Sequence, residues 1–279
     1  MQPFAATRQL SGDEFRQITT LLHDHTGIAL APGKEALVAG RLDKRLRQLG
    51  LGGYGEYLAM LRGGQDEVEL HQMINLLTTN ETFFFREPRH FELLSRVIVP
   101  QRAPGRTFRM WSAASSTGEE AYTGAMVLAE SLPPAQWEIL GTDISSRVVE
   151  TARKALYSMD AAAKIPQPML RRYCLRGREE YAGLMTICRE LRSRVQFHCI
   201  NLMEDIRQLG SFDVIFLRNV MIYFDLETKR DLVDRMQNVL VPGGFLVIGS
   251  SESLNAIPSD LRMVEPSVYR LAPTGVDRA

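Results

Sequence analysis

The sequence predicts an α/β protein in which a doubly wound domain follows an all-helical region. The segment 106–114 has the pattern of a strand ending in small residues, and a turn of serine, threonine and glycine then leads into an apolar helix at 121–132. A buried strand from residue 212, a helix at 226–240 and a Pro-Gly-Gly turn before an apolar strand continue the alternation. Strands and helices in regular succession are typical of a parallel sheet covered by helices.

A carboxylate marks the end of the second strand. The strand at 137–141 is followed by Thr142 and Asp143. An acidic residue at this point, 25 residues after Gly118, suits a bidentate hydrogen bond to ribose hydroxyls. The turn at 115–118 holds one glycine instead of G-x-G-x-x-G, which disfavours a pyrophosphate dinucleotide. A ligand with an adenosine and no phosphates fits better, and S-adenosylmethionine (SAM) is the obvious member of that class.

The run TTNETFFFR at 78–86 places three successive phenylalanines among polar and charged residues. This mixture suits a wall that contacts a ligand with both apolar and charged parts. The alternative is a domain junction in which the phenylalanines pack and Arg86 is solvated.

The first ninety residues predict a helical domain. Ser11 and Glu14 have the spacing of a capping box, and Gly27 ends the helix that they begin. Apolar residues then repeat at helical spacing. The further helices are expected at about 33–49, 54–61 and 68–77.

Composition excludes several classes of function. The 33 basic and 33 acidic residues balance, which argues against a global field for nucleic-acid binding. No apolar run reaches membrane-spanning length, and the N-terminus lacks a signal-peptide core. Cys174, Cys188 and Cys199 are expected to be reduced thiols in a cytoplasmic protein. His23 and His25 lack a third ligand, so we expect no metal site.

Six motifs carry a resemblance to a known family. They are TTNETFFFR at 78–86, WSAASSTGEEAYT at 111–123, GTDIS at 141–145, INL at 200–202, FLRNVMIYFD at 216–225 and LVPGGFLVIGSSESL at 240–254. In this order they resemble the CheR family of chemotaxis receptor methyltransferases, which are protein-glutamate O-methyltransferases. The resemblance implies a Rossmann-like class I SAM-dependent methyltransferase domain at 91–279, preceded by an all-helical domain at 1–90. It also implies a small antiparallel β subdomain inserted at about 160–195.

The implied activity is methyl transfer from SAM, with S-adenosylhomocysteine as the product. The acceptors would be glutamate side chains on the cytoplasmic helices of methyl-accepting chemotaxis receptors, and the protein would act as a cytoplasmic monomer. Some members hold a pentapeptide at a receptor's C-terminus through the β subdomain, and these tend to have a glycine-rich loop there. This chain offers only the well-separated Gly177 and Gly183, which leaves pentapeptide binding open.

The resemblance also assigns cofactor contacts. Asn80, Thr82 and Arg86 would touch SAM, with Arg86 near its methionine carboxylate. Glu119 would face the methionine part, and Asp143 would hold the ribose hydroxyls.

The remaining site residues come from later motifs. Asn201 and Leu202 would flank the adenine, and Arg218 and Asn219 would close the pocket at the end of the fourth strand. Tyr223 is a catalytic candidate beside Arg86 and would orient the incoming carboxylate, with a buried tyrosine of purely structural role as the alternative. A glutamate carboxylate is ionised at neutral pH, so no strong general base is needed.

The second expected helix, at about 33–49, is basic. Arg41, Lys44, Arg45 and Arg47 lie on the second expected helix. They form either an ordinary solvated face or, as the resemblance implies, a docking surface for an acidic receptor helix.

Other functions stay open at this point. Methyltransferases that act on amino groups often carry two prolines and an aromatic after an acidic or amide residue, whereas Asn219 is followed by Val-Met-Ile-Tyr. A methyltransferase for another protein substrate or a non-catalytic receptor-binding adaptor is also possible, and the apparently intact cofactor set argues against the adaptor. A nicotinamide oxidoreductase is remote because the phosphate-binding glycines are missing.

Overall fold

The computed structural model describes residues 9–63 and 67–272 and divides them into two compact units. The helical unit holds the described residues up to Thr79 together with Tyr223–Asp225. The sheet unit holds Asn80–Ile222 and the described residues from Leu226 onward. The division therefore lies ahead of residue 90, where the sequence placed the boundary.

The earlier division follows from packing. Phe84 and Phe91 are buried in the hydrophobic core of the sheet unit, so the segment that carries them belongs with the sheet. The insertion of Tyr223–Asp225 into the helical unit has a similar cause. The backbone N–H of Ala29 donates to the Tyr223 carbonyl at 2.8 Å, and Ile28 forms an isolated antiparallel bridge with Phe224.

The helical unit is built from amphipathic helices. Its described helices are α1 (Gly12–Thr26), α2 (Glu35–Gln48), α3 (Tyr54–Arg62) and α4 (Glu67–Leu77). The capping box is confirmed: the Glu14 N–H donates to Ser11 Oγ at 3.2 Å, and the Ser11 N–H donates to Glu14 Oε2 at 2.9 Å. Gly27 ends α1 with a φ of 73°, a left-handed conformation that glycine adopts without steric cost.

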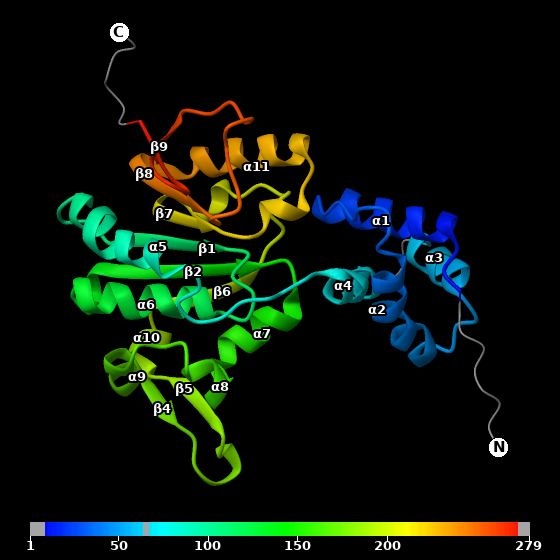
Figure 1. The fold of residues 1–279 in the computed structure, drawn as a ribbon, viewed down its shortest axis with the longest axis horizontal. Coiled ribbons are helices and arrows are strands. Elements are labelled where there is room, and N and C mark those ends of the chain that lie inside the picture. Colours follow the sequence, from blue (N-terminus) through cyan, green and yellow to red (C-terminus); the bar gives the residue numbers. More distant parts are fainter. Residues whose placement is uncertain (1–8, 64–66, 273–279) are drawn as a thin grey trace. The chain divides into compact units, whose positions relative to one another are not determined.

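A seven-stranded sheet forms the centre of the other unit (Figure 1). Its strands are β1 (Phe108–Ala113), β2 (Trp137–Asp143), β6 (Val195–Cys199), β7 (Phe212–Leu217), β8 (Leu240–Ile248), β9 (Leu261–Glu265) and β10 (Val268–Leu271). The order is β6-β2-β1-β7-β8-β10-β9, and all neighbours from β6 to β8 are parallel, whereas β10 is antiparallel to β8 and β9. This arrangement confirms the predicted doubly wound α/β fold.

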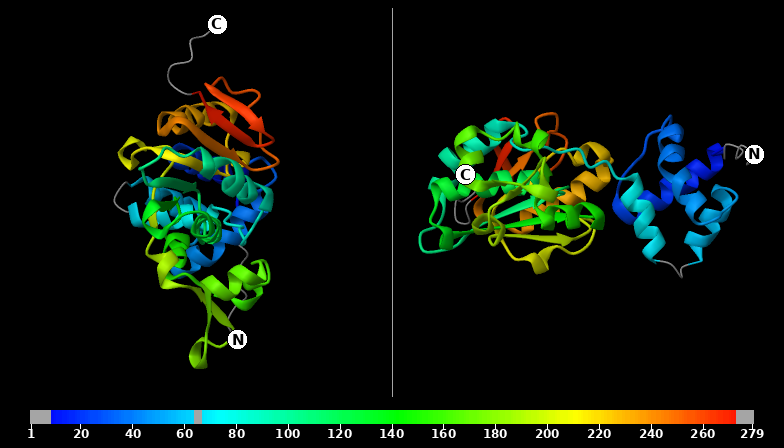
Figure 2. Two further views of the ribbon diagram at one scale, coloured as in Figure 1. Left: turned by 90° about the vertical axis from the view of Figure 1, so that its left-hand side faces the viewer. Right: turned by 90° about the horizontal axis from the view of Figure 1, so that it is seen from below.

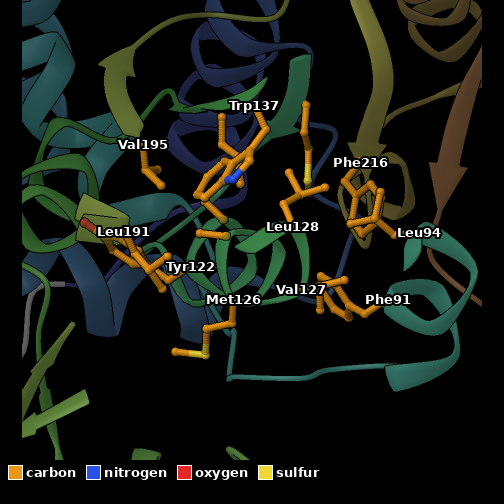
Figure 3. Close-up of a cluster of buried hydrophobic side chains, with 14 of the residues drawn as sticks. Phe91, Leu94, Tyr122, Met126, Val127, Leu128, Trp137, Leu191, Val195 and Phe216 are labelled. Carbon is orange, nitrogen blue, oxygen red and sulfur yellow. The ribbon is translucent and has the colours of Figure 1, made fainter. Parts of the chain in front are cut away.

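Helices connect the strands and supply the core. They are α5 (Pro88–Leu93), the π-helix η1 (Leu94–Ile98), the 3-10 turns η2 (Val99–Gln101), η3 (Pro134–Gln136), η5 (Arg207–Leu209) and η6 (Met221–Tyr223), and the helices α6 (Glu119–Ser131), α7 (Ser146–Lys154) and α11 (Leu226–Asn238). Figure 3 shows one cluster in which Tyr122, Met126 and Leu128 of α6 gather with Trp137 of β2 and Phe216 of β7. The buried residues of α11 lie outside this cluster. The handedness of the connections explains this separation. The connection from β1 to β2 through α6 and that from β7 to β8 through α11 step across the sheet in opposite directions, so right-handed crossovers place the two helices on opposite faces.

A three-stranded antiparallel sheet interrupts the alternation between α7 and β6. Its order is β3 (Leu156–Ser158), β5 (Leu184–Ile187) and β4 (Cys174–Arg176), with α8 (Met159–Ala162), α9 (Gln167–Tyr173), η4 (Glu179–Tyr181) and α10 (Arg189–Arg192) around it. Figure 1 and the left view of Figure 2 both show that this small sheet projects away from the large sheet. The predicted antiparallel subdomain is confirmed, and its first strand begins before residue 160. No helix of the described residues is long and apolar enough to cross a membrane.

Candidate functional site

The carboxyl ends of four neighbouring parallel strands bring the predicted site residues to one edge of the sheet. Along this edge lie Asn201 after β6, Asp143 at the end of β2, the turn after β1 and Asn219 after β7. From β1 the chain continues to β2 and β6 on one side of the sheet, whereas β7 and β8 lie on the other side of β1. The strand order therefore reverses between β1 and β7, which is a topological switch point. In open α/β sheets ligands bind in the crevice at this point.

The backbone N–H groups of the turn after β1 donate hydrogen bonds within the protein. The N–H of Ser115 donates to the Thr142 carbonyl at 2.7 Å, that of Ser116 to Asp143 Oδ2 at 2.9 Å and that of Gly118 to the Ser115 carbonyl at 3.0 Å. A phosphate cradle needs such donors free. The geometry therefore agrees with the sequence in disfavouring a phosphate ligand, because the Asp143 carboxylate already accepts one of these bonds.

Close packing beneath the turn explains its single glycine. Gly118 has a φ of 95°, and a Cβ there would lie 2.9 Å from the Ala152 Cβ and 3.1 Å from the Phe197 ring. Tyr157 supports the turn from below, since its hydroxyl donates to the Thr117 carbonyl at 2.8 Å. The turn is thus held in place by the helix α7 and the strand β6.

Asp143 is buried at the end of β2, with 6% of its surface exposed. Its Oδ1 accepts the N–H of Ser145 at 2.9 Å, and its Oδ2 accepts that of Ser116. Burial raises the pKa of Asp143 above its ordinary value, although these hydrogen bonds favour the charged form. The two bonds fix the carboxylate plane between the β1 turn and the start of α7.

Glu119 begins α6 and is also buried. Its Oε2 accepts a hydrogen bond from Thr117 Oγ1 at 2.6 Å, and burial raises its pKa. An acidic side chain at a helix N-terminus is favoured by the helix dipole. Glu119 and Asp143 thus place two acidic groups at the turn, and both can attract a ligand that carries hydroxyls or positive charge.

The segment from Asn80 to Arg86 runs beside this turn. The Asn80 carbonyl accepts a hydrogen bond from Ser116 Oγ at 2.8 Å, and Thr82 is half-buried. Arg86 is half-buried too, and its Nη1 donates to the Glu81 carbonyl at 2.9 Å. Phe84 is the one of the three phenylalanines that is fully buried. The run therefore combines core packing at Phe84 with polar groups beside the turn, and the ligand contact expected from the sequence stays a prediction.

Arg218 has a buried, internal role at this edge. Its side chain is 1% exposed, its Nη1 donates to Glu120 Oε2 at 2.9 Å, and its Nη2 donates to the Arg86 carbonyl. Glu87 Oε2 lies 3.5 Å away. Arg218 thus ties the 80–87 segment to α6 and β7. Glu87 and Glu120 are members of this cluster that the sequence reasoning missed, although both stand beside predicted residues in the quoted motifs.

Asn201 and Leu202 follow β6 at the same edge of the sheet. Asp143 is paired with Cys199 in the last register of β2 and β6, and the Ile200 N–H donates to the Asp143 carbonyl at 3.0 Å. Asn201 Oδ1 accepts the N–H of Met203 at 3.0 Å, which forms a tight turn. Leu202 is buried, and its carbonyl accepts a hydrogen bond from Arg235.

The basic helix α2 divides into two kinds of residue. Arg41 Nη1 donates to the Leu77 and Thr78 carbonyls at 2.7 and 3.2 Å, and Arg45 pairs with the buried Glu69 of α4. Only Lys44 and Arg47 of the four are exposed. The expectation that all four face solvent is wrong for Arg41 and Arg45, because the planar guanidinium finds bidentate partners within the unit.

Tyr223 belongs to the helical unit by its contacts and is half-buried. The sheet-unit residues Asn80, Glu119, Asp143, Asn201 and Asn219 gather along one sheet edge. Their chemistry fits SAM, because acidic acceptors suit ribose hydroxyls and a cationic sulfonium or ammonium. In the turn after β1, the N–H groups of Ser115, Ser116 and Gly118 are already bonded within the protein.

Comparison with known proteins agrees with this geometry. The family model described as CheR methyltransferase, SAM binding domain, matches residues 80–270, and the one described as CheR methyltransferase, all-alpha domain, matches residues 13–78. The chemotaxis protein methyltransferase of Salmonella typhimurium is 40% identical over 266 residues, covering 94% of this chain and 91% of that protein. Chemotaxis protein methyltransferase 2 of Pseudomonas aeruginosa is 41% identical over 273 residues, covering 96% and 95%. The chain belongs to the CheR methyltransferase family, and its sheet unit is a SAM-binding methyltransferase domain.

Proposed function

We propose that this protein transfers the methyl group of SAM to glutamate side chains on the cytoplasmic helices of chemotaxis receptors and forms glutamyl methyl esters. The observation that carries the proposal is the match of both units, over nearly the whole chain, to proteins named chemotaxis protein methyltransferases. The cytoplasm is then the place of action, because the acceptor helices lie there.

The chemistry of a carboxylate acceptor suits the groups at the site. When bound, SAM supplies an electrophilic methyl group on a positively charged sulfur. A glutamate acceptor is already ionised at neutral pH, so the protein needs to hold it in line and remove water from it. The acidic groups at this edge have internal partners: Asp143 accepts backbone N–H groups, Glu119 accepts a hydrogen bond from Thr117 Oγ1, and Glu120 accepts one from Arg218. This arrangement favours orientation over proton abstraction.

Each residue then has a definite task in the proposal. Asp143 accepts hydrogen bonds from the ribose hydroxyls, and Glu119 faces the positively charged methionine part of the cofactor. Arg86 meets the methionine carboxylate, while Asn201 and Leu202 flank the adenine. Asn80 and Thr82 complete the wall beside the turn, and Tyr223 orients the acceptor carboxylate.

The type of bond formed provides the test. Receptor cytoplasmic fragments incubated with methyl-labelled SAM and this protein should gain label that mild alkali releases as methanol, because a methyl ester hydrolyses under those conditions. A fragment whose acceptor glutamates are changed to alanine is the control and should gain no label. Methylated lysine or arginine survives alkali, so alkali-stable label would contradict the proposal.

A receptor-binding adaptor without turnover is the second candidate. It would bind receptor fragments with SAM present and yet transfer no label. Calorimetry with SAM, run beside the labelling assay, separates the two: an active enzyme shows both cofactor binding and alkali-labile product.

A further inference from the structure

The turn after β7 is held by two glutamates that come from distant parts of the sequence. Asn219 has a φ of 59°, a left-handed conformation that asparagine tolerates better than most residues. Glu252 follows β8, and Glu87 precedes α5. Neither glutamate was singled out in the sequence, because neither stands in a recognisable spacing to Asn219.

Glu252 fixes the backbone of this turn. Its Oε2 accepts the N–H groups of Asn219 at 2.9 Å and Gly249 at 2.7 Å, and its Oε1 accepts that of Ile222 at 3.2 Å. The missing side chain at Gly249 makes the approach possible, since a Cβ there would lie 2.6 Å from Asn219 Nδ2 and 2.8 Å from Glu252 Oε2. One carboxylate therefore ties the end of β8 to the whole turn.

Glu87 fixes the side chain of Asn219. Its Oε1 accepts a hydrogen bond from Asn219 Nδ2 at 3.3 Å, and its Oε2 accepts the N–H and the Oγ–H of Ser250 at 3.1 and 2.9 Å. Burial opposes the charged form, but Arg218 and Ser250 outweigh it and hold the pKa of Glu87 below its ordinary value. Glu87 is then ionised at neutral pH.

An ionised carboxylate can only accept hydrogen bonds, and this decides which way the Asn219 amide faces. The NH₂ group must point toward Glu87, so the carbonyl oxygen Oδ1 points away from it. Among the described residues, none donates a hydrogen bond to this Oδ1. It is therefore an acceptor in a fixed orientation at the switch point between β1 and β7.

We propose that Glu87 and Glu252 are positioning residues that present Asn219 Oδ1 to the positively charged end of SAM. A carbonyl oxygen attracts the sulfonium or ammonium group, whereas an NH₂ group in the same place would repel it. The inference rests on the proposed function and on the place at the cofactor pocket that the resemblance implies for Asn219, and it adds the two residues that set the polarity of that contact.

The change Glu87→Gln tests the orientation directly. The carbonyl of the introduced glutamine would take the position that receives Ser250 and faces Arg218, because more donors converge there. Its NH₂ group would then face Asn219 and force the asparagine amide to flip. We expect roughly a tenfold loss of SAM affinity by calorimetry, the size of one hydrogen bond to a charged group.

A reciprocal exchange separates orientation from mere structural support. Asn219→Asp alone should also weaken SAM binding, because two carboxylates would face each other. The double variant Glu87→Gln with Asn219→Asp should regain most of the affinity, since the introduced aspartate can accept from the introduced glutamine with one oxygen and present the other. Glu265→Gln, which changes a half-exposed carboxylate that pairs with Arg89, is the matched control and should bind SAM like the wild type.

Two results would overturn the proposal: a double variant that binds SAM no better than Glu87→Gln, or an unchanged affinity in Asn219→Ala. The alanine variant leaves the Glu87–Ser250 hydrogen bonds intact and so decides the question even if Glu87→Gln does not fold. Glu252→Gln should speed amide hydrogen exchange at Asn219 and Ile222. Unchanged exchange at both would show that Glu252 is not a positioning residue. None of these measurements involves a receptor, so they are independent of the acceptor proposed above.

Discussion

Arg45 of α2 and Glu69 of α4 form a bidentate ion pair inside the helical unit. Arg45 Nε lies 3.0 and 3.1 Å from the two carboxylate oxygens, and Nη2 also donates to Oε2. The Glu69 side chain is only 3% exposed, and the Tyr57 hydroxyl donates to its Oε1 at 2.9 Å. Three helices thus share one buried carboxylate, which gives Arg45 a structural role.

This pair predicts a stability effect at Arg45. Arg45→Met should lower the free energy of unfolding by about 3 kcal/mol, because it removes the guanidinium that pairs with the buried Glu69 carboxylate. Denaturant unfolding measures the change. Lys44→Met, one residue away and exposed, is the control and should stay within about 0.5 kcal/mol of the wild type. A loss at position 44 as large as that at position 45 would contradict the role given to the pair.

The exposed members of α2 predict a docking effect. If Lys44 and Arg47 contact an acidic receptor helix, changing both to glutamate should strongly reduce receptor methylation and leave SAM affinity unchanged. Added salt should slow the wild-type reaction, because exposed charges are screened over about 10 Å at about 0.1 M. Arg16 and Arg62, exposed cations of α1 and α3, provide the control charge reversal. Full methylation by the Lys44 and Arg47 variant would show that α2 is an ordinary solvated surface.

The sequence predicted those features that depend on local pattern. The capping box at Ser11 and Glu14, the buried strand at β7 and the carboxylate at the end of β2 all follow from residue spacing and burial, and the structure confirms them. The order of parallel strands then brings Asp143 and Asn219 to one edge of the sheet, as any doubly wound fold does.

Pairing between distant side chains could not be predicted in the same way. Arg41 and Arg45 share a helix with Lys44 and Arg47 and have the same charge, so only the fold shows that the first two bind α4 and its C-terminal end. The same limit applies to Glu87 and Glu252, whose bonds to Asn219 join residues more than thirty positions apart. Glu252 lies inside a quoted motif and Glu87 directly follows one, which indicated the neighbourhood of each but not its partner.

His90 predicts a dependence of stability on pH. It is 3% exposed, and burial, helped by nearby Arg218, lowers its pKa from 6.5 to about 4. Between these values the unfolded chain binds a proton that the folded protein does not, so stability falls as the pH drops through this range. When the pH drops from about 7 to about 5, the free energy of unfolding should fall by about 2 kcal/mol less in His90→Gln than in the wild type. Denaturant unfolding at both pH values measures this, and the exposed His198→Gln should behave as wild type.

Asp143 allows the sharpest test of the cofactor site, because the sheet contains a matched carboxylate at its other end. Asp143 ends β2, whereas Asp213 stands near the start of β7; each is 6% exposed and accepts a backbone N–H group. Asp213 Oδ2 accepts the N–H of Arg109 at 2.8 Å, and Arg106 pairs with its other oxygen. Removing either carboxylate leaves buried donors without a partner, so both changes should lower stability.

Only the change at Asp143 should affect SAM. Asp143→Ala removes the acceptor proposed for two ribose hydroxyls, and hydrogen bonds to a charged group are worth about 1.5–3 kcal/mol, so calorimetry should show a loss of roughly tenfold or more. Asp213→Ala should bind SAM with wild-type affinity, since it lies at the edge of the sheet away from the turn. Equal losses in the two variants would mean that Asp143 acts through the stability of the fold, and unchanged affinity in a folded Asp143→Ala would remove it from the cofactor site.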